Sequence, residues 1–520
     1  MGDTEPQTAY ILVGLVVIFA TATWFSSQSR KLNHIPSLTT DLPILSLIGV
    51  FRCLFQSNDL IQQGYEKYKG AAFRIPELFR WHVLVSGKTM VDELRKANDD
   101  ELNFMDAMND LMHMDYTFGP DTHHNPYHIS VIRTSLTRNL GVLYRDVRDE
   151  LVTATREFIP PSDDWVPVRA FETIMKIVCR TSNRIFVGLP LCRDPEFMEM
   201  NMKFTMEVVK AGYMVGAVPE VFRSMVAKFT PMEKIKRRAE EILRPVIEER
   251  LRMIEEYGED WPDKPVIGFS SLEVATSLTD VRQNDMVSWL IDLAPRGKET
   301  VPSVALRVLT VNFAAIHTST MTFSNVLYHL AASPEYQVEL REEVDRVVAE
   351  HGWSKEALGK MIKVDSFIKE TGRFEGLGAL SLTRKAVKDF TFSDGTFIPK
   401  GTIVSATSRA THFDDENYEN AEMFDPWRFA RMEKTDSADT AALRNQFVNA
   451  RPEILTFGLG KHACPGRFFA STELKSLLAN FVVAYDMKFE KEGVLPSPTW
   501  VTTSVVPNRS AIVMFRRRQV

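Results

Sequence analysis

The chain has 520 residues, of which 44% are hydrophobic and 25% are charged, a composition typical of globular proteins. Its net charge of -6 argues against a nucleic-acid-binding protein, which usually carries an excess of basic residues. The four cysteines, Cys53, Cys179, Cys192 and Cys464, are scattered along the chain. Their spacing argues against a zinc site and a disulfide framework, and it favours a reducing compartment.

An uncharged apolar run, Ala9–Phe25, opens the chain. It is close to the lower end of the roughly 17 to 25 residues needed to span a bilayer core. A cleaved signal peptide would have basic residues in front of the run, but Asp3 and Glu5 stand there instead. Basic residues follow the run from Arg30, so the positive-inside rule places the rest of the chain in the cytosol. We therefore expect residues 1–30 to be a membrane anchor.

Short apolar runs at 73–75 and 82–85 predict two strands around a turn, and 89–97 predicts a helix. Two methionine-rich segments follow, at 103–120 and 198–214. Methionine is unbranched and polarisable, so it fits irregular apolar shapes. These segments are therefore compatible with ordinary core packing or with a pliable wall around a lipophilic substrate.

Helical spacing continues through 127–147, which carries Arg133, and through the highly charged segment 231–257, which predicts an exposed surface helix. The sequence contains no internal repeat and no Gly-rich dinucleotide fingerprint after a strand. The chain therefore shows no flavin or nicotinamide domain of its own, and any electrons that it uses must come from another protein.

The segment 304–330 predicts a long apolar helix that starts near Pro302. Ala314 and Ala315 lie at its middle, where small side chains let a large group approach the backbone. Thr318 follows them one turn later. A threonine at this place also has an ordinary structural explanation, a hydrogen bond back to the carbonyl four residues earlier.

Glu370 and Arg373 have the i, i+3 spacing at which side chains on a helix meet. A surface pair of this kind contributes only about 0.2 to 0.5 kcal/mol, and the spacing is too common to identify a protein. Farther along the chain, Asp394-Gly395 predicts a tight hairpin turn.

The most informative segment is Phe457–Ala470, a Gly-rich loop that leads into a helix after Gly466. Cys464 therefore stands at a helix N-terminus, where the dipole and free N–H groups lower the pKa of a thiol. A thiolate at such a place is a nucleophile or a metal ligand. The alternative is a buried cysteine that acts as a small apolar residue.

This loop resembles the haem-binding loop of the cytochrome P450 haem-thiolate monooxygenases, which reads Phe-x-x-Gly-x-Arg-x-Cys-x-Gly. Phe457, Gly460, Cys464 and Gly466 match that pattern. His462 stands where arginine is usual, a change associated with some fungal members. The resemblance extends over nearly the whole chain and decides between the alternatives for the cysteine.

The resemblance implies a mainly α fold with small β-sheets (α+β), the cytochrome P450 fold, with an N-terminal transmembrane anchor helix. Residues 31–520 would form the catalytic domain. The implied cofactor is heme b, with the Cys464 thiolate as axial ligand of the iron. The implied partners are an NADPH-dependent flavoprotein reductase, a lipophilic small-molecule substrate and the endoplasmic reticulum membrane, with the catalytic domain cytosolic and no nucleic acid.

The resemblance also implies roles for individual side chains. The residues expected to hold the haem are Cys464, Arg133, His128, Arg384, His462 and Phe457. Arg133 and Arg384 would bind propionates, and His128 would replace a tryptophan donor that the family usually has. Thr318 and His317 are the expected catalytic residues, and His317 stands where the family has an acid.

Two further expectations follow from the family pattern. Glu370 and Arg373 would join Arg428 in a network that supports the cysteine loop, and Leu380 and Ser381 would line the substrate pocket. The expected reaction is insertion of one oxygen atom from O2 into a lipophilic molecule, in fungal secondary metabolism with a terpenoid-like substrate. The alternatives are a haem-thiolate isomerase or dehydratase that does not use O2, and a non-catalytic, membrane-anchored haem protein that only senses or carries a ligand.

Overall fold

A computed structural model of the chain describes residues 30–39, 45–77, 80–257, 285–432 and 446–519. The anchor predicted at residues 1–30 lies outside the described part, apart from Arg30. Within the described part, one helix, α14 (Val301–Ala332), is long and apolar enough to cross a membrane. However, 56% of its most apolar window is buried within the protein, which is the behaviour of a core helix.

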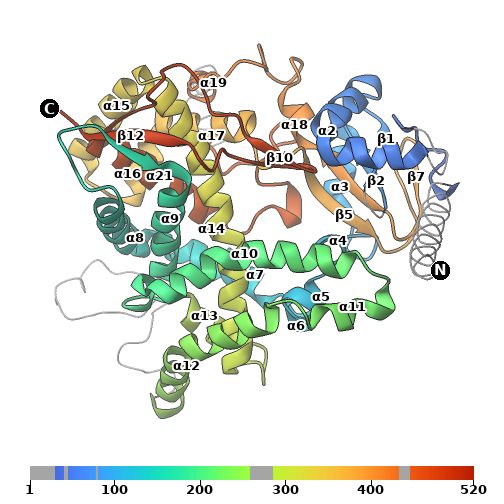
Figure 1. Cartoon of the computed structure of the whole chain (residues 1–520), viewed down its shortest axis with the longest axis horizontal. Helices are drawn as coiled ribbons and strands as arrows, with labels where there is room; N and C mark the ends of the chain where they lie inside the picture. The colour runs from blue at the N-terminus through green and yellow to red at the C-terminus, as the bar shows by residue number, and fades with distance from the viewer. Residues whose placement is uncertain (1–29, 40–44, 78–79, 258–284, 433–445, 520) are drawn as a thin grey trace, which may run out of the picture.

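Helices make up most of the molecule, and α14 runs through its middle with α10 crossing it (Figure 1). The other helices in the first half of the chain are α2 (Leu45–Lys67), α3 (Lys88–Lys96), α4 (Phe104–Met112), α5 (Met114–Thr117), α6 (Pro120–His124), α7 (Tyr127–Val131), α8 (Thr137–Phe158), α9 (Ala170–Phe186), α10 (Pro195–Gly216), α11 (Glu220–Ala227) and α12 (Met232–Tyr257). The second half adds α13 (Met286–Asp292), α15 (Glu335–His351), α16 (Lys355–Lys360), α17 (Ile362–Phe374), α18 (Ser408–His412), α19 (Arg428–Met432) and α21 (Arg467–Ala484).

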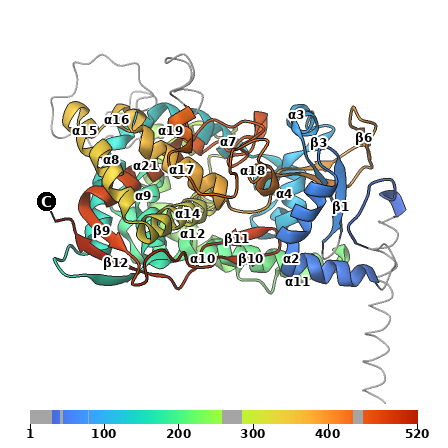
Figure 2. The ribbon, with the colours of Figure 1, turned by 90° about the horizontal axis from the view of Figure 1, so that it is seen from above.

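The strands form small sheets at the edges of this helical body. They are β1 (Ala72–Pro76), β2 (Trp81–Val85), β3 (Leu102–Asn103), β4 (Val166–Arg169), β5 (Leu380–Ala386), β6 (Phe390–Thr391), β7 (Phe397–Ile398), β8 (Ile403–Thr407), β9 (Tyr485–Lys488), β10 (Thr499–Val501), β11 (Ser504–Val506) and β12 (Ile512–Arg517). The largest sheet has the order β1-β2-β8-β5-β3, with β2 and β8 parallel and its other pairs antiparallel. A second sheet, β4-β12-β9, lies at the opposite end of the molecule, near the C-terminus (Figures 1 and 2).

The core surrounds the second half of α14, where every residue from Phe323 to Ala332 is buried. Phe323 of α14 meets Phe481 of α21 edge to face, with ring centroids 5.1 Å apart. Both belong to one buried cluster with Phe367 of α17 and Leu151 of α8. This cluster fixes α21, and therefore the loop in front of it, relative to α14.

Most predicted elements are present close to their expected bounds. The two predicted strands are β1 and β2, the hairpin at Asp394-Gly395 joins β6 to β7, and the charged helix is α12. The mainly α fold with small sheets is therefore confirmed.

The helix predicted over 127–147 differs, because a π-helical turn at Ile132–Leu136 separates α7 from α8. A π turn adds a residue to one turn of the helix, so the side chains before it are rotated relative to those after it. Arg133 lies within this turn, so the helical pattern alone could not place its side chain.

Candidate functional site

The loop before α21 is shaped by glycines at positions with positive φ. Gly458 and Gly460 have φ values of 67° and 74°, a region that favours glycine. A Cβ on Gly460 would also lie only 2.4 Å from Cγ of Arg95. The loop closes where the N–H of Cys464 donates to the carbonyl of Phe457 at 2.8 Å. As the sequence predicts, Cys464 is thereby placed at the N-terminus of α21.

The pKa of the Cys464 thiol differs from the sequence expectation. Burial raises this pKa above its usual value, and the N–H groups of Gly466 and Arg467 and the charge of Arg467 offset the rise only in part. Desolvation of the sulfur therefore affects the pKa of Cys464 more strongly than the helix N-terminus does. A metal ion bound to the sulfur would reverse that balance, because a coordinating thiol is deprotonated by the ion's charge.

A cavity of about 630 Å³ lies beside Cys464. Five of the six residues expected to contact the haem line it, and these are Cys464, Arg133, Arg384, His462 and Phe457. Met105 and Met108 of α4 also line it, so part of the first methionine-rich segment is a cavity wall. The cavity thus joins a sulfur ligand, basic side chains and an apolar wall, which are the features that an amphipathic cofactor requires.

Arg384 provides the clearest indication of what the cavity holds. Its side chain is only 2% exposed, and within the described residues it forms no ion pair. One guanidinium N–H donates to the carbonyl of Thr383 at 2.9 Å, and the guanidinium lies 5.6 Å from the ring centroid of Phe104. Burial lowers the pKa of Arg384 to about 10, which still leaves it charged at neutral pH. The charge of Asp99 opposes part of this change, but no described acid forms an ion pair with Arg384. A buried cation of this kind fits an anionic group in the cavity, such as a haem propionate.

Other basic groups of the cavity already have partners. The Nε2 atom of His462 lies 2.6 Å from a carboxylate oxygen of Asp99, and the Nζ of Lys461 lies 3.3 Å from the same oxygen. Burial lowers the pKa of His462, although the carboxylate of Asp99 opposes the change. Arg133 is exposed and donates to the carbonyl of Lys461 at 3.0 Å. These contacts hold the cysteine loop against the segment before β3.

His128, the sixth expected haem contact, does not line this cavity. It is buried, and its Nδ1 atom has no hydrogen-bond partner within the described residues. Burial, and to a smaller extent the charge of Arg307, lower the pKa of His128 to about 4. The imidazole is therefore neutral at physiological pH, and it is not among the residues that line the cavity where a propionate would lie.

The two expected catalytic residues lie on α14 and are not part of the cavity wall beside Cys464. Thr318 and Ala314 are exposed although most residues around them are buried, and their spacing of four places them on one face of the helix. The Thr318 hydroxyl donates to the carbonyl of Ala314 at 2.8 Å, which is the structural hydrogen bond that the sequence also allows. The open face nevertheless leaves the hydroxyl oxygen accessible.

His317 is directed toward another helix. Its Nε2 atom lies 2.8 Å from the carbonyl oxygen of Met202 in α10, so the ring nitrogen is the donor. Burial lowers the pKa of His317, which favours the neutral ring. The contact joins the centre of α14 to the second methionine-rich segment.

The predicted network of Glu370, Arg373 and Arg428 is confirmed. Glu370 receives two hydrogen bonds from Arg373, at 2.7 and 2.8 Å, and a third from Arg428 at 3.2 Å, and all three side chains are buried. Arg373 also donates to the carbonyl of His412 at 2.6 Å, and Nε2 of His412 accepts from the N–H of Leu455 at 2.9 Å. The network is therefore connected through His412 to the segment that leads into the cysteine loop.

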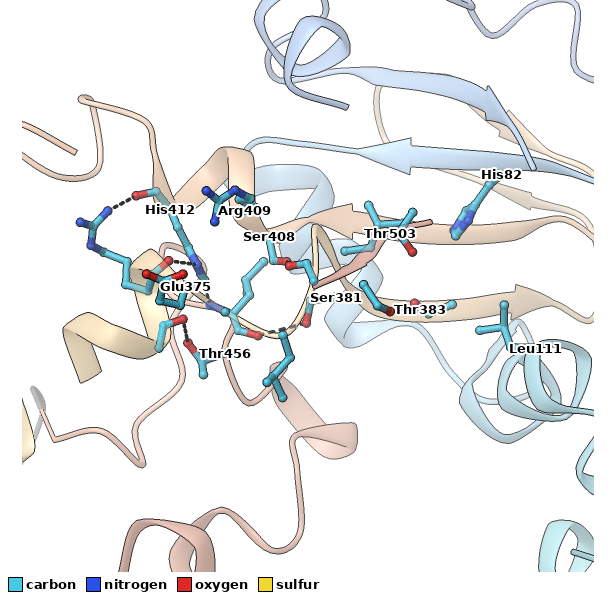
Figure 3. A pocket seen from close by; sticks show the side chains of 18 of the residues that line it. His82, Leu111, Glu375, Ser381, Thr383, Ser408, Arg409, His412, Thr456 and Thr503 are labelled. Atoms are coloured by element: carbon cyan, nitrogen blue, oxygen red, sulfur yellow. Dashed lines mark hydrogen bonds between the residues drawn. The ribbon is translucent and has the colours of Figure 1, made fainter. Parts of the chain in front are cut away.

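A smaller cavity of about 220 Å³ adjoins the sheet, and Figure 3 shows Ser381, Thr383 and Thr503 around it. Ser381 and Thr383 also line the cavity beside Cys464, whereas Leu380 lines only the smaller one. The predicted substrate-contacting segment at 380–381 therefore borders both spaces.

Sequence reasoning missed a chain of hydrogen bonds that reaches this region. His82 of β2 lies 2.7 Å from a carboxylate oxygen of Glu77 and 2.8 Å from the hydroxyl of Ser405, which donates to Thr383 at 2.8 Å. Electrostatic attraction and hydrogen bonds from His82 and Arg80 lower the pKa of Glu77 to about 2 despite its burial. His82, Ser405 and Thr383 come from three different strands and Glu77 directly follows β1, and no local pattern in the sequence marks them as partners.

Glu473 is a second buried acid that the sequence did not indicate. It lies on α21, fully buried, and accepts a hydrogen bond from Ser182 of α9 at 2.7 Å. Burial raises its pKa to about 7, and hydrogen bonds from Ser182 and Ser319 limit the rise. It stands nine residues after Cys464 among polar neighbours such as Thr472 and Lys475, so no local pattern in the sequence marks it as buried.

Comparisons with known proteins agree with this geometry. A sequence profile of the family described as Cytochrome P450 matches residues 36–515. Cytochrome P450 monooxygenase 151 of Postia placenta is 41% identical and covers 100% of both chains. Cytochrome P450 monooxygenase CYP512U6 of Ganoderma lucidum is 32% identical, over 99% of this chain and 97% of its own. The retinoic acid-bound structure of cyanobacterial CYP120A1 has a TM-score of 0.63 at 17% identity, over 90% of this chain and 96% of its own, which shows a shared fold.

Proposed function

The chain belongs to the cytochrome P450 family, and on that basis we propose that it inserts one oxygen atom from O2 into a lipophilic small molecule. The observation that supports this proposal best is the cavity where the sulfur of Cys464 and the buried guanidinium of Arg384 occur together. Haem b fits these residues, because Cys464 can ligate the iron and Arg384 can pair with a propionate. When bound, a haem with a thiolate ligand supplies electron donation that favours cleavage of the O–O bond.

Thr318 is the proposed proton donor of the reaction. Its hydroxyl is bonded to the carbonyl of Ala314, and its oxygen is open on the exposed face of α14. The hydroxyl oxygen can accept a hydrogen bond from water, and rotation of the hydroxyl away from the Ala314 carbonyl would free its own proton for donation. His317, neutral and bonded to Met202, would hold α10 in place beside this face.

The proposed substrate is lipophilic, and we favour a terpenoid-like molecule of fungal secondary metabolism. Met105, Met108 and Phe104 supply an apolar wall, and flexible methionine side chains can adapt to an irregular carbon skeleton. The relatives that support the fungal part of the proposal include the Cytochrome P450 monooxygenase paxQ of Penicillium paxilli, which is 31% identical over 89% of this chain and 88% of its own.

The proposed electron source is a separate NADPH-dependent flavoprotein reductase, because the sequence has no dinucleotide-binding fingerprint. Residues 1–30 are the proposed anchor in the endoplasmic reticulum membrane, and 31–520 the proposed cytosolic catalytic domain. Phe51 and Phe55 of α2 are 65% and 69% exposed, which supports contact between this end of the domain and a lipid surface.

The full-length protein, expressed in microsomes with a fungal reductase, tests the proposal. We expect a ferrous–CO complex with the red-shifted Soret band of thiolate ligation, and products one oxygen atom heavier than apolar substrates when both NADPH and O2 are present. Cys464→Ala should lose the shifted band and the products, whereas Cys53→Ala should keep both.

The same experiment separates the alternatives. Product formation without NADPH or O2 would indicate an isomerase or dehydratase. A normal CO spectrum without turnover of any substrate in a broad panel would favour a ligand-binding protein. If the shifted band persists in Cys464→Ala, a residue other than Cys464 is the haem ligand.

A further inference from the structure

A cluster of potential metal ligands lies on the short helices that follow α4, apart from the cavity beside Cys464. It consists of Asp115 in α5 and of His123 and His124 in α6, and one carboxylate oxygen and two ring nitrogens of these residues lie within 4.8 Å of one another. Nδ1 of His123 is 3.2 Å from Oδ1 of Asp115, and the two imidazole centroids are 4.4 Å apart. We call these three residues the His-Asp cluster.

The outer atoms of two of these ligands are already held by neighbouring side chains. Nε2 of His123 lies 3.0 Å from a carboxylate oxygen of Asp106 in α4, and the second carboxylate oxygen of Asp115 accepts from Asn109 at 2.9 Å. A carboxylate that accepts the outer N–H of a histidine fixes its tautomer and leaves the other ring nitrogen as a metal ligand. This arrangement is characteristic of protein metal sites, and it leaves Nδ1 of His123 and Oδ1 of Asp115 facing each other.

From this geometry we propose that the His-Asp cluster binds a zinc ion through Nδ1 of His123, a ring nitrogen of His124 and a carboxylate oxygen of Asp115. A water molecule would complete the tetrahedron. Zn–N and Zn–O bonds of about 2.0 to 2.2 Å put neighbouring tetrahedral ligands about 3.3 to 3.5 Å apart, close to the separation of His123 and Asp115. The spacing of the cysteines did not predict this zinc site, because its proposed ligands are histidine and carboxylate side chains.

Access and charge are also suited to a cation. His123 is 8% exposed and the Asp115 side chain 34%, whereas His124 is exposed at the surface. The two carboxylates of Asp106 and Asp115 flank the His123 ring, so they offset the charge of a divalent ion.

The bound zinc would cross-link elements that are too short to be stable by themselves. α5 and α6 have four and five residues, fewer than an isolated helix needs. The zinc would join them directly, and the bond from His123 to Asp106 would extend the link to α4, which carries Met105 and Met108 of the cavity wall. The proposed site would therefore stiffen the cover of the cavity.

Zinc uptake by the purified full-length protein tests the site. The protein is stripped with a chelator, dialysed against buffered micromolar Zn²⁺, and analysed for zinc per chain by mass spectrometry. We expect one equivalent in the wild type, loss of it in His124→Ala and Asp115→Asn, and affinity about 10- to 100-fold weaker in Asp106→Asn, which alters only the supporting bond. His351→Ala is the matched control, since His351 also lies beside an acid, Glu350, on the distant α15.

Hydrogen exchange gives a readout independent of catalysis and of overall folding. Zn²⁺ should slow exchange of the amides in 104–124 in the wild type and in His351→Ala, and should have no effect on them in His124→Ala, whose exposed side chain is not needed for folding. Equal zinc uptake by wild type and His124→Ala, or less than one equivalent in the wild type, would overturn the proposal. If the protein takes up zinc but amide exchange in 104–124 is not slowed, the ion binds elsewhere and the proposal is also wrong.

Discussion

Glu370 and Arg373, one turn apart on α17, form a two-point ion pair in which both side chains are fully buried. The same i, i+3 spacing on a helix surface contributes only a few tenths of a kcal/mol. Burial makes the Glu370–Arg373 pair more important for stability, because removing either partner would leave the other as an uncompensated charge in the protein interior.

We therefore predict that Arg373→Met destabilises the protein by about 3 to 5 kcal/mol, because it leaves the buried carboxylate of Glu370 without this partner and removes the donors to the carbonyls of His412 and Ala421. Urea unfolding of the full-length protein measures the change. Lys210→Ala breaks an exposed pair of the same spacing with Glu207 and should cost less than about 1 kcal/mol. Similar losses in the two variants would contradict the role given to burial.

Of the two arginines proposed to bind haem propionates, Arg384 should contribute more to haem binding than Arg133. Arg384→Gln removes a buried, charge-assisted interaction worth about 1.5 to 3 kcal/mol, so haem should dissociate about 10- to 100-fold more readily. Arg133→Gln removes an exposed charge and should have less than about a fivefold effect. Haem transfer to apomyoglobin measures both rates, and equal effects would show that burial of Arg384 does not decide haem retention.

Thr318→Val should uncouple electron use from oxygen insertion, because valine has the shape of threonine without its hydroxyl. NADPH consumption should continue while product falls and peroxide rises. Thr322, one turn later, makes an equivalent bond to the carbonyl of Thr318 at 2.9 Å, so Thr322→Val controls for loss of such a bond. The proton-donor role is wrong if the ratio of product to NADPH is unchanged in Thr318→Val.

Glu473 should make the stability of the protein depend on pH. Burial raises its pKa from an ordinary value of 4.5 to about 7, so between these values the folded chain keeps a proton that the unfolded chain has lost. The contribution of Glu473 to the free energy of unfolding therefore falls as the pH rises from about 4.5 to about 7 and is constant above that. The total decrease is about 3 kcal/mol.

Glu473→Gln keeps the shape of the side chain and cannot ionise, so it should gain stability relative to the wild type as the pH rises from about 5 to about 8. Urea midpoints across that range measure the difference. Glu492→Gln, at an exposed glutamate, is the control and should follow the wild type. A constant difference between Glu473→Gln and the wild type would mean that Glu473 ionises normally.

Local sequence patterns were sufficient for the elements and for the most informative residue. The strands β1 and β2, the apolar α14 and the helix after Gly466 are present because hydrophobic periodicity and glycine positions act over a few residues. Cys464 could be recognised for the same reason, since its loop is one contiguous segment. The buried Glu370 network could also be expected, because its spacing and its partner Arg428 belong to a known pattern.

Only the tertiary structure decided where the remaining side chains point. The π turn around Arg133, the bond from His317 to Met202 and the pairing of His462 with Asp99 depend on which elements pack together. Partners separated by 115 or 363 positions leave no periodic signal in one sequence. The direction of the Cys464 pKa shift was decided in the same way, because desolvation by surrounding elements outweighs the local effect of the helix end.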